Sequence, residues 1–174
     1  LPITENAPIK PAESPYGNTK QIGEEIIRDT CKVCKELKST ALRYFNPIGA
    51  HASAEIGELP IGVPQNLVPF ITQTAIGMRE ELSVFGGDYP TEDGTCIRDY
   101  IHVVDLAKAH VTALNRMLNK KQKSDWEIFN LGTGNGFSVL QVIKAFEKVS
   151  DTTLNYEITG RRAGDIEKVW ADTE

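Results

Sequence analysis

Tyr16 and Lys20 are the residues of this chain whose types and spacing best suit proton transfer, because they stand four positions apart. Ser14 and Pro15, just before them, are typical of a helix start: serine caps free backbone N–H groups, and proline suits the first helical position. Residues four apart on a helix share one face. An ammonium group stabilises the phenolate form of a neighbouring tyrosine, which favours general acid–base chemistry. We therefore predict a helix over residues 14–37 with this pair on its buried face.

Cys31 and Cys34 continue that face beyond Ile27. Their C-x-x-C spacing can hold a metal ion or a redox disulfide. A zinc site needs further cysteine or histidine ligands, and the sequence has neither a second cysteine pair nor a nearby histidine. We therefore expect two reduced thiols that face the core, and no metal site in the chain.

The composition is that of an ordinary globular protein. The chain has 174 residues, of which 40% are hydrophobic and 25% charged, enough for one domain with its own core. Its net charge of −5 offers no basic surface for nucleic acid or an anionic membrane. No apolar run approaches the roughly 20 residues of a membrane-spanning helix. Because no signal-peptide pattern opens the sequence, we expect a cytoplasmic protein.

Strands and helices alternate along the sequence, which is typical of the α/β class. A strand over residues 41–45 should end at Asn46, where a loop begins. Asp105 and Ser138 are expected to cap helices, the latter in a capping box with Gln141. The remaining strands are expected over residues 82–85, 97–104, 127–131 and 154–159, and the remaining helices over residues 64–77, 105–118 and 138–149.

Residues 131–136 form a glycine-rich turn between a predicted strand and a predicted helix, where phosphate-binding loops occur. Their spacing is G-x-G-x-G, whereas dinucleotide-binding loops have G-x-G-x-x-G. The acidic residue expected about 20 positions further on, Glu157, falls inside the next strand pattern. We therefore disfavour a cofactor-binding loop here and expect an ordinary turn between a strand and a helix.

Three stretches carry a family resemblance. Residues 14–20 resemble the catalytic tyrosine–lysine motif of the extended short-chain dehydrogenase/reductase family, in the form carried by UDP-glucose 4-epimerases. Residues 43–51 and 93–107 also resemble signatures of that family, and the likeness runs in order from Leu1 to Glu174.

The resemblance implies an α/β fold that comprises the C-terminal part of an NAD-binding Rossmann-type doubly wound domain and a smaller α/β substrate-binding domain. Residues 1–50 would end the cofactor domain and carry the catalytic helix. Residues 51–174 would form mainly the substrate domain, with some segments returning to the cofactor domain. The glycine-rich NAD loop and a further active-site Ser or Thr would precede Leu1, so we expect this chain to be inactive alone.

The implied reaction is the NAD-dependent interconversion of UDP-glucose and UDP-galactose through a 4-keto sugar. Tyr16 would take the proton of the sugar 4-hydroxyl, and Lys20 would stabilise its phenolate and contact the nicotinamide ribose. Tyr44 and Phe45 match residues that line the nicotinamide pocket. The alternative is that Tyr44 and Phe45 are core residues without a role in binding, because aromatic residues at a strand end often are.

A sugar nucleotide carries two phosphates, so its site needs cations and fixed donors. The resemblance assigns Arg98 and Arg162 to the diphosphate and Asp165 to a ribose hydroxyl. A lone arginine is usually a solvated surface charge, but these two lie inside matching motifs. Asn46 and Asn66 match amides that contact the substrate, although asparagine is also favoured in turns and caps.

The remaining implied contacts surround the base and the sugar. Leu67, Ser83 and Phe85 match positions around the uracil, although an alternating strand would bury some of them anyway. Val169 matches a position over the 2-substituent of the sugar that is filled by tyrosine in some members. Valine is smaller, so we expect UDP-N-acetylhexosamines to be accepted as well.

The first predicted helix also bears on assembly. Ile22, Ile26 and Val33 lie off the line of Ile27, and a helix that is apolar on several sides should be buried on two faces. The resemblance implies a homodimer that pairs this helix with its symmetry mate. Alternatives are a dehydratase or decarboxylase of the same family, a non-catalytic module that senses a dinucleotide, and a structural fragment.

Overall fold

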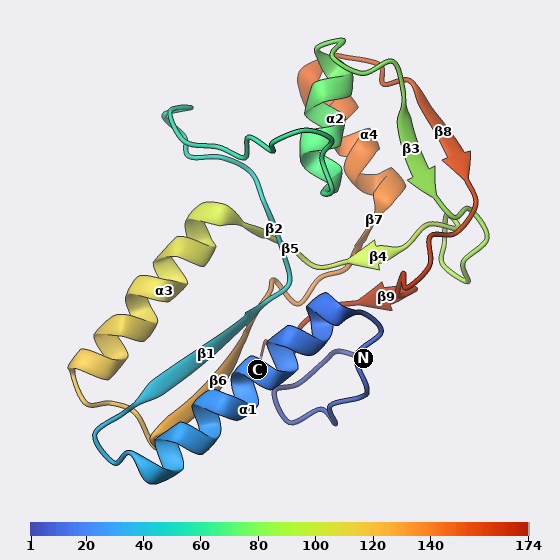
Figure 1. The fold of residues 1–174 in the computed structure, drawn as a ribbon. Helices are drawn as coiled ribbons and strands as arrows, with labels where there is room; N and C mark the ends of the chain where they lie inside the picture. Colours follow the sequence, from blue (N-terminus) through green and yellow to red (C-terminus); the bar gives the residue numbers. More distant parts are fainter. Residues whose placement is uncertain (174) are drawn as a thin grey trace.

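The computed structural model describes residues 1–173, which form an α/β structure of four helices and nine strands (Figure 1). The helices are α1 (Pro15–Val33), α2 (Leu67–Ala75), α3 (Val103–Leu118) and α4 (Val139–Ser150). The strands are β1 (Ser39–Tyr44), β2 (Asn46–Ile48), β3 (Leu82–Phe85), β4 (Ile97–Arg98), β5 (Tyr100–His102), β6 (Trp126–Leu131), β7 (Phe137–Ser138), β8 (Tyr156–Thr159) and β9 (Lys168–Val169).

One part of the molecule is built on the parallel pair β1–β6, which runs in register from Ser39 opposite Trp126 to Tyr44 opposite Leu131. Helices α1 and α3 both contact β1, and Figure 1 shows them on either side of the pair. Parallel strands need such helical crossovers and are covered by helices on their faces. This part is therefore a fragment of a doubly wound sheet.

The other part is built on the parallel pair β3–β8, with α2 and α4 beside it in Figure 1. Leu82 and Val84 of β3 point into its core, whereas Ser83 and Phe85 point to the opposite face. The core is closed by apolar residues of both helices and of the segment before β8, namely Ile71, Leu140, Ile143 and Leu154.

A three-stranded sheet, β7–β4–β9, and the short parallel pair β2–β5 connect the two parts at the centre of Figure 1. The predicted strand does end before Asn46, since β1 ends at Tyr44, but the prediction that a loop begins there is wrong, because Asn46 begins β2, opposite Tyr100 of β5. Pro47 is tolerated there because β2 pairs on one side only among the described strands, and a proline without an N–H can occupy an edge strand.

The helix starts are partly as predicted. The Ser14 hydroxyl accepts a hydrogen bond from Gly17 N at 3.1 Å, so this cap is confirmed. The capping box of Ser138 and Gln141 is also confirmed. The prediction that Asp105 caps a helix is wrong: α3 begins two residues earlier, and His102 Nδ1 accepts from Val104 N at 3.2 Å. The sequence did not suggest a histidine cap, because serine, threonine, aspartate and asparagine are the preferred N-cap residues.

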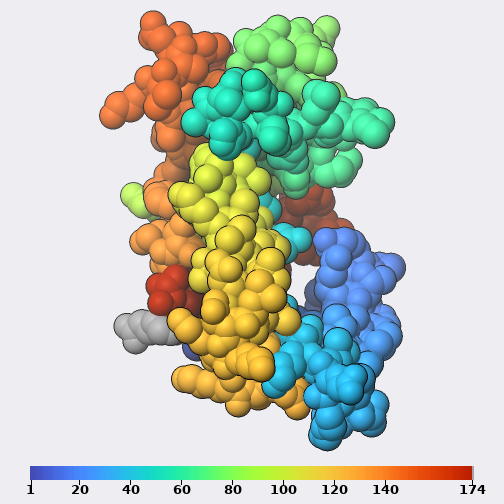
Figure 2. Space-filling view, turned by 90° about the vertical axis from the view of Figure 1, so that its left-hand side faces the viewer, coloured from blue at the N-terminus to red at the C-terminus, as the bar shows by residue number. Residues whose placement is uncertain are grey.

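The prediction of a long buried face on α1 is wrong in this chain. The helix ends at Val33, so Cys34 lies beyond its last turn and is exposed, whereas Cys31 is buried. Tyr16 is 72% exposed and Ile26 is 61% exposed. Figure 2 shows α1 standing apart from α3, with a hollow between them. Within residues 1–173, α1 packs mainly against β1, so a helix that is apolar on several sides leaves most of that surface uncovered.

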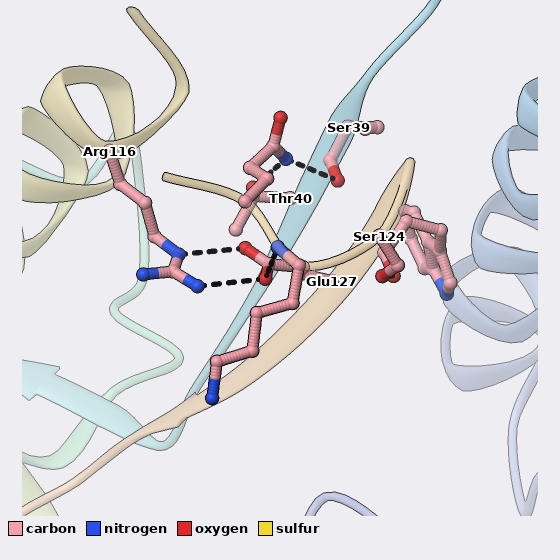
Figure 3. A network of polar contacts seen from close by, with 8 residues as sticks. Ser39, Thr40, Arg116, Ser124 and Glu127 are labelled. Atoms are coloured by element: carbon pink, nitrogen blue, oxygen red, sulfur yellow. Dashed lines mark hydrogen bonds and ion pairs between the residues drawn. The ribbon is translucent and has the colours of Figure 1, made fainter. Parts of the chain in front are cut away.

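A partly buried ion pair joins the end of α3 to β6 (Figure 3). The Arg116 guanidinium donates to both carboxylate oxygens of Glu127, at 2.8 and 2.9 Å, and Lys123 N donates to the same carboxylate at 2.8 Å. These donors, with Arg116 foremost, outweigh the opposing effect of burial and lower the pKa of Glu127 from 4.5 to about 2.

None of the helices in residues 1–173 has both the length and the apolar character that crossing a membrane requires.

Candidate active site

A cavity of about 430 Å³ lies between α2, β3, β4 and the segment that follows β8. Every residue predicted to bind the sugar nucleotide lines it, except Val169. The predicted residues on its wall are Asn46, Asn66, Leu67, Ser83, Phe85, Arg98, Arg162 and Asp165. These residues come from five separate stretches of sequence, so the fold gathers them at one place.

Three charged side chains converge on this cavity. Arg162 Nη2 donates to Asp165 Oδ1 at 2.8 Å, and Arg98 Nη2 lies 3.7 Å from the same oxygen. The Asp165 side chain is only 10% exposed, and its hydrogen bond raises the pKa of Arg162 above the usual value. Two guanidinium groups share one carboxylate, so the cluster keeps one net positive charge. Such a cluster suits an anionic ligand, because guanidinium binds phosphate oxygens in a bidentate manner.

An apolar surface and polar groups adjoin this cluster on the wall of the cavity. The guanidinium carbon of Arg162 lies 5.4 Å from the centre of the Phe85 ring, which leaves this aromatic ring at the edge of the cavity. Asn66 occupies the N-cap of α2, but its side chain donates to Glu58 Oε1 at 2.6 Å and makes no capping bond within the described structure. Because Pro69 has no N–H and Phe70 N donates to Asn66 O, the first turn of α2 offers the N–H groups of Leu67 and Val68 beside the cavity.

Several cavity residues were missed by the sequence analysis, among them Gln65, Cys96 and Tyr100. Burial raises the pKa of Tyr100 to about 12, so its phenol stays protonated and can donate a hydrogen bond. Side chains alternate along extended backbone, so Tyr100 should share the face of Arg98 two positions before it. That alternation was the signal that could have identified it.

Of the predicted catalytic pair, Lys20 lines a second, smaller cavity of about 380 Å³, together with Tyr44 and Phe45. Lys20 Nζ lies 4.9 Å from the centre of the Tyr16 ring, so the two side chains share one face of α1 as predicted. Tyr16 itself is exposed and does not belong to the wall of this cavity. The structure thus brings lysine, tyrosine and aromatic residues of the predicted cofactor site to one region.

The glycine-rich turn is not free to bind a phosphate. Its amides Thr133 N and Gly134 N donate to the carboxylate of Asp99, at 2.8 and 3.1 Å. A Cβ atom on Gly132 would come within 2.3 Å of that carboxylate, so the glycine is needed for close approach. The interpretation of this turn as a cofactor loop is therefore wrong, because an internal carboxylate takes the donors that a phosphate would need.

Val169 lies on β9, opposite Arg98 of the neighbouring strand β4. It is half-buried and does not line the larger cavity. The predicted contact of Val169 with the sugar is therefore not part of the wall that the other predicted residues share.

Comparison with known proteins gives the family. Residues 1–132 match the NAD dependent epimerase/dehydratase family. Since this match spans more than half of the sequence, the chain belongs to the NAD dependent epimerase/dehydratase family, and the predicted α/β Rossmann-type fold class is confirmed.

Particular relatives share about half of their length with this chain. It is 51% identical over 172 residues to UDP-glucose 4-epimerase of Erwinia amylovora, covering 99% of this chain and 50% of the relative. It is 53% identical over 171 residues to UDP-glucose 4-epimerase of Bacillus subtilis (strain 168), covering 98% of this chain and 49% of the relative. The chain thus spans about half the length of the curated relatives it matches.

A solved structure agrees with these relatives. The crystal structure of UDP-glucose 4-epimerase from Stenotrophomonas maltophila, with bound NAD and formylated UDP-arabinopyranose, is similar with a TM-score of 0.92 and 48% identity. The similarity covers 98% of this chain and 50% of that one.

Proposed function

We propose that this chain is the substrate-binding half, with the catalytic helix, of an NAD-dependent UDP-glucose 4-epimerase. Joined to the remaining half, it interconverts UDP-glucose and UDP-galactose. The observation that carries this proposal is the larger cavity, where Arg98, Arg162 and Asp165 meet beside an aromatic ring. A cationic cluster next to an apolar wall fits a ligand with a base at one end and a diphosphate in the middle.

Within this proposal, each wall of the larger cavity has a role. Arg98 and Arg162 bind the diphosphate, and Asp165 binds a ribose hydroxyl. Leu67, Ser83 and Phe85 surround the uracil, and the amides of Asn46 and Asn66 contact the substrate. The free N–H groups at the start of α2 add donors for a phosphate oxygen.

The smaller cavity fits the nicotinamide end of NAD. Its wall offers the ammonium of Lys20 for ribose hydroxyls and the rings of Tyr44 and Phe45 for the nicotinamide. When bound, NAD supplies a hydride acceptor that also returns the hydride. The pyrophosphate end needs backbone amides that the turn at residues 132–136 does not offer, so we assign it to the remaining half.

This chain supplies the proton chemistry. The phenolate oxygen of Tyr16 takes the proton of the sugar 4-hydroxyl and later returns it. The ammonium of Lys20, one helical turn away, stabilises the phenolate. The apolar surface left uncovered on α1 supports a homodimer, and the short side chain of Val169 supports acceptance of UDP-N-acetylhexosamines. We further propose that residues 1–50 belong to the cofactor domain, that residues 51–174 belong mainly to the substrate domain, and that the enzyme is cytoplasmic.

The decisive experiment joins this chain to the half of the Bacillus subtilis relative that it does not match. We expect the chimera to convert UDP-galactose to UDP-glucose, measured by coupling the product to UDP-glucose oxidation. Tyr16→Phe should lower kcat about 10²–10⁴-fold, because it removes the general acid–base group, while UDP binding persists. Tyr156→Phe, on β8, is the matched control and should keep full activity. A chimera that binds UDP but does not epimerise, or a Tyr16→Phe variant at full rate, would refute the proposal.

A further inference from the structure

Asp99 is a fully buried carboxylate, 0% exposed, which the proposed mechanism does not use. It has no ion-pair partner in the part of the chain that the structure describes. Four donors surround it instead. Thr133 N and Thr133 Oγ1 donate to Oδ1 at 2.8 and 2.7 Å, and Gly134 N and Ala171 N donate to Oδ2, both at 3.1 Å. A buried charge is tolerated when hydrogen bonds replace its lost hydration, so this arrangement is specific to a carboxylate.

Asp99 lies where short strands of the two central sheets come together. Strand β4 is hydrogen-bonded to β7 and β9 as far as Arg98. Beyond Arg98 the three strands separate, and the Asp99 carboxylate bridges the gap by binding Gly134 N, before β7, and Ala171 N, after β9. The Asp99 backbone oxygen accepts from Asn46 N at 3.0 Å, where β2 begins. Asp99 is thus the point at which the chain passes from one sheet to the other.

We propose that Asp99 is a positioning residue for nucleotide binding, which holds Arg98 in place relative to Asn46 across the larger cavity. Arg98 precedes Asp99 directly, and Asn46 is bonded to its backbone. If the carboxylate is lost, β4 keeps its backbone pairing with β7 and β9 but loses the bonds directly beyond Arg98, and the Arg98 guanidinium is held less firmly in its approach to a diphosphate. This inference rests on the proposed function, because it assigns the diphosphate to Arg98.

Asp99→Asn is a sharp test, because the side chains have nearly the same shape. Each carboxylate oxygen accepts two hydrogen bonds, so either orientation of the amide sets an NH₂ group against two donors. Asp93→Asn is the matched control: the Asp93 carboxylate also accepts from Thr95 and Ser138, and neither of these lines the cavity. Thr133→Val is a milder variant, which removes one donor to Asp99 and leaves the charge.

The experiment titrates this chain and its three variants with UDP and with uridine by calorimetry. We expect Asp99→Asn to weaken UDP binding on the order of tenfold, the effect of one charge-assisted contact, and uridine binding by less than about threefold. Thr133→Val should shift the UDP-to-uridine affinity ratio in the same direction, by about threefold, and Asp93→Asn should leave that ratio unchanged. The ratio of the two affinities is the informative quantity, because a general destabilisation of the fold weakens the binding of UDP and of uridine alike.

The outcomes separate this inference from the proposed function. A folded Asp99→Asn variant with the wild-type ratio would overturn the positioning role while leaving the nucleotide cavity intact. If Asp99→Asn does not fold, an unchanged ratio in Thr133→Val would overturn it equally. A wild-type chain that binds neither UDP nor uridine would refute the nucleotide cavity, and the positioning role with it.

Discussion

The ion pair between Arg116 and Glu127 makes the stability of this chain depend on pH in a predictable way. The folded-state pKa of Glu127, about 2, lies below its ordinary value of 4.5. A group whose pKa is depressed by folding stabilises the folded state above the higher of the two values. That stabilisation is lost progressively as the pH falls from 4.5 towards 2. We therefore expect Glu127→Gln to remove both this stabilisation and its pH dependence.

The magnitude follows from the same shift. One pKa unit corresponds to about 1.4 kcal/mol, so the full shift sets an upper limit of about 3 kcal/mol. The Glu127 side chain is 7% exposed, but that of Arg116 is 29% exposed, and solvent screens ion pairs near a surface. We therefore expect Glu127→Gln to lower the free energy of unfolding at pH 7 by about 1–2 kcal/mol. Urea denaturation followed by circular dichroism measures it.

Asp125→Asn is the control for this prediction, because it breaks the more exposed pair of Asp125 with Lys38. It should leave the free energy of unfolding at pH 7 close to that of the wild type. The wild type and Glu127→Gln are then unfolded in urea at several pH values between 5 and 2.5. If Glu127→Gln loses as much stability as the wild type over this range, the ion pair is not the cause and the reasoning is refuted.

Two further predictions concern the complete enzyme. Ile26→Glu, at an exposed apolar position of α1, should give monomers in sedimentation velocity, whereas Val149→Glu on the exposed side of α4 should not; a wild-type enzyme that sediments as a monomer would rule out pairing through α1. Val169→Tyr should abolish activity on UDP-N-acetylhexosamines and spare UDP-galactose, as measured by kcat/KM for both substrates. Wild-type discrimination against the acetamido sugar by orders of magnitude would refute the role of Val169 as a gate.

Local chemistry was the part of the fold that the sequence predicted best. The caps at Ser14 and Ser138 depend on residues three positions apart, and the predicted strand over residues 82–85, confirmed as β3, depends on neighbours in one segment. The burial of α1 was predicted wrongly for a different reason. Apolar residues indicate that a face is covered in the final assembly, but not whether the covering element belongs to the same stretch of chain. The exposed Tyr16 and Ile26 are the result.

The site was predicted through the resemblance more than through spacing. Arg98, Arg162 and Asp165 are far apart in the sequence or lie on a charged turn, and only the fold brings them within ion-pair distance. Tyr100 could have been found by alternation, because it stands two positions after Arg98. Gln65 and Cys96 carried no comparable signal, since a polar loop residue and a single thiol are compatible with many environments.

The glycine-rich turn explains why a motif needs its partner to be interpreted. Backbone amides at such a turn attract an anion, although the glycine spacing at residues 131–136 disfavoured a phosphate there. The anion is the carboxylate of Asp99, which lies more than 30 positions earlier in the chain. Here the carboxylate links the end of β4 to the segments before β7 and after β9. If a bound phosphate occupied this place, that link would depend on the ligand. The same local chemistry can therefore build a cofactor site or a structural joint, and only the residue that approaches the amides decides which.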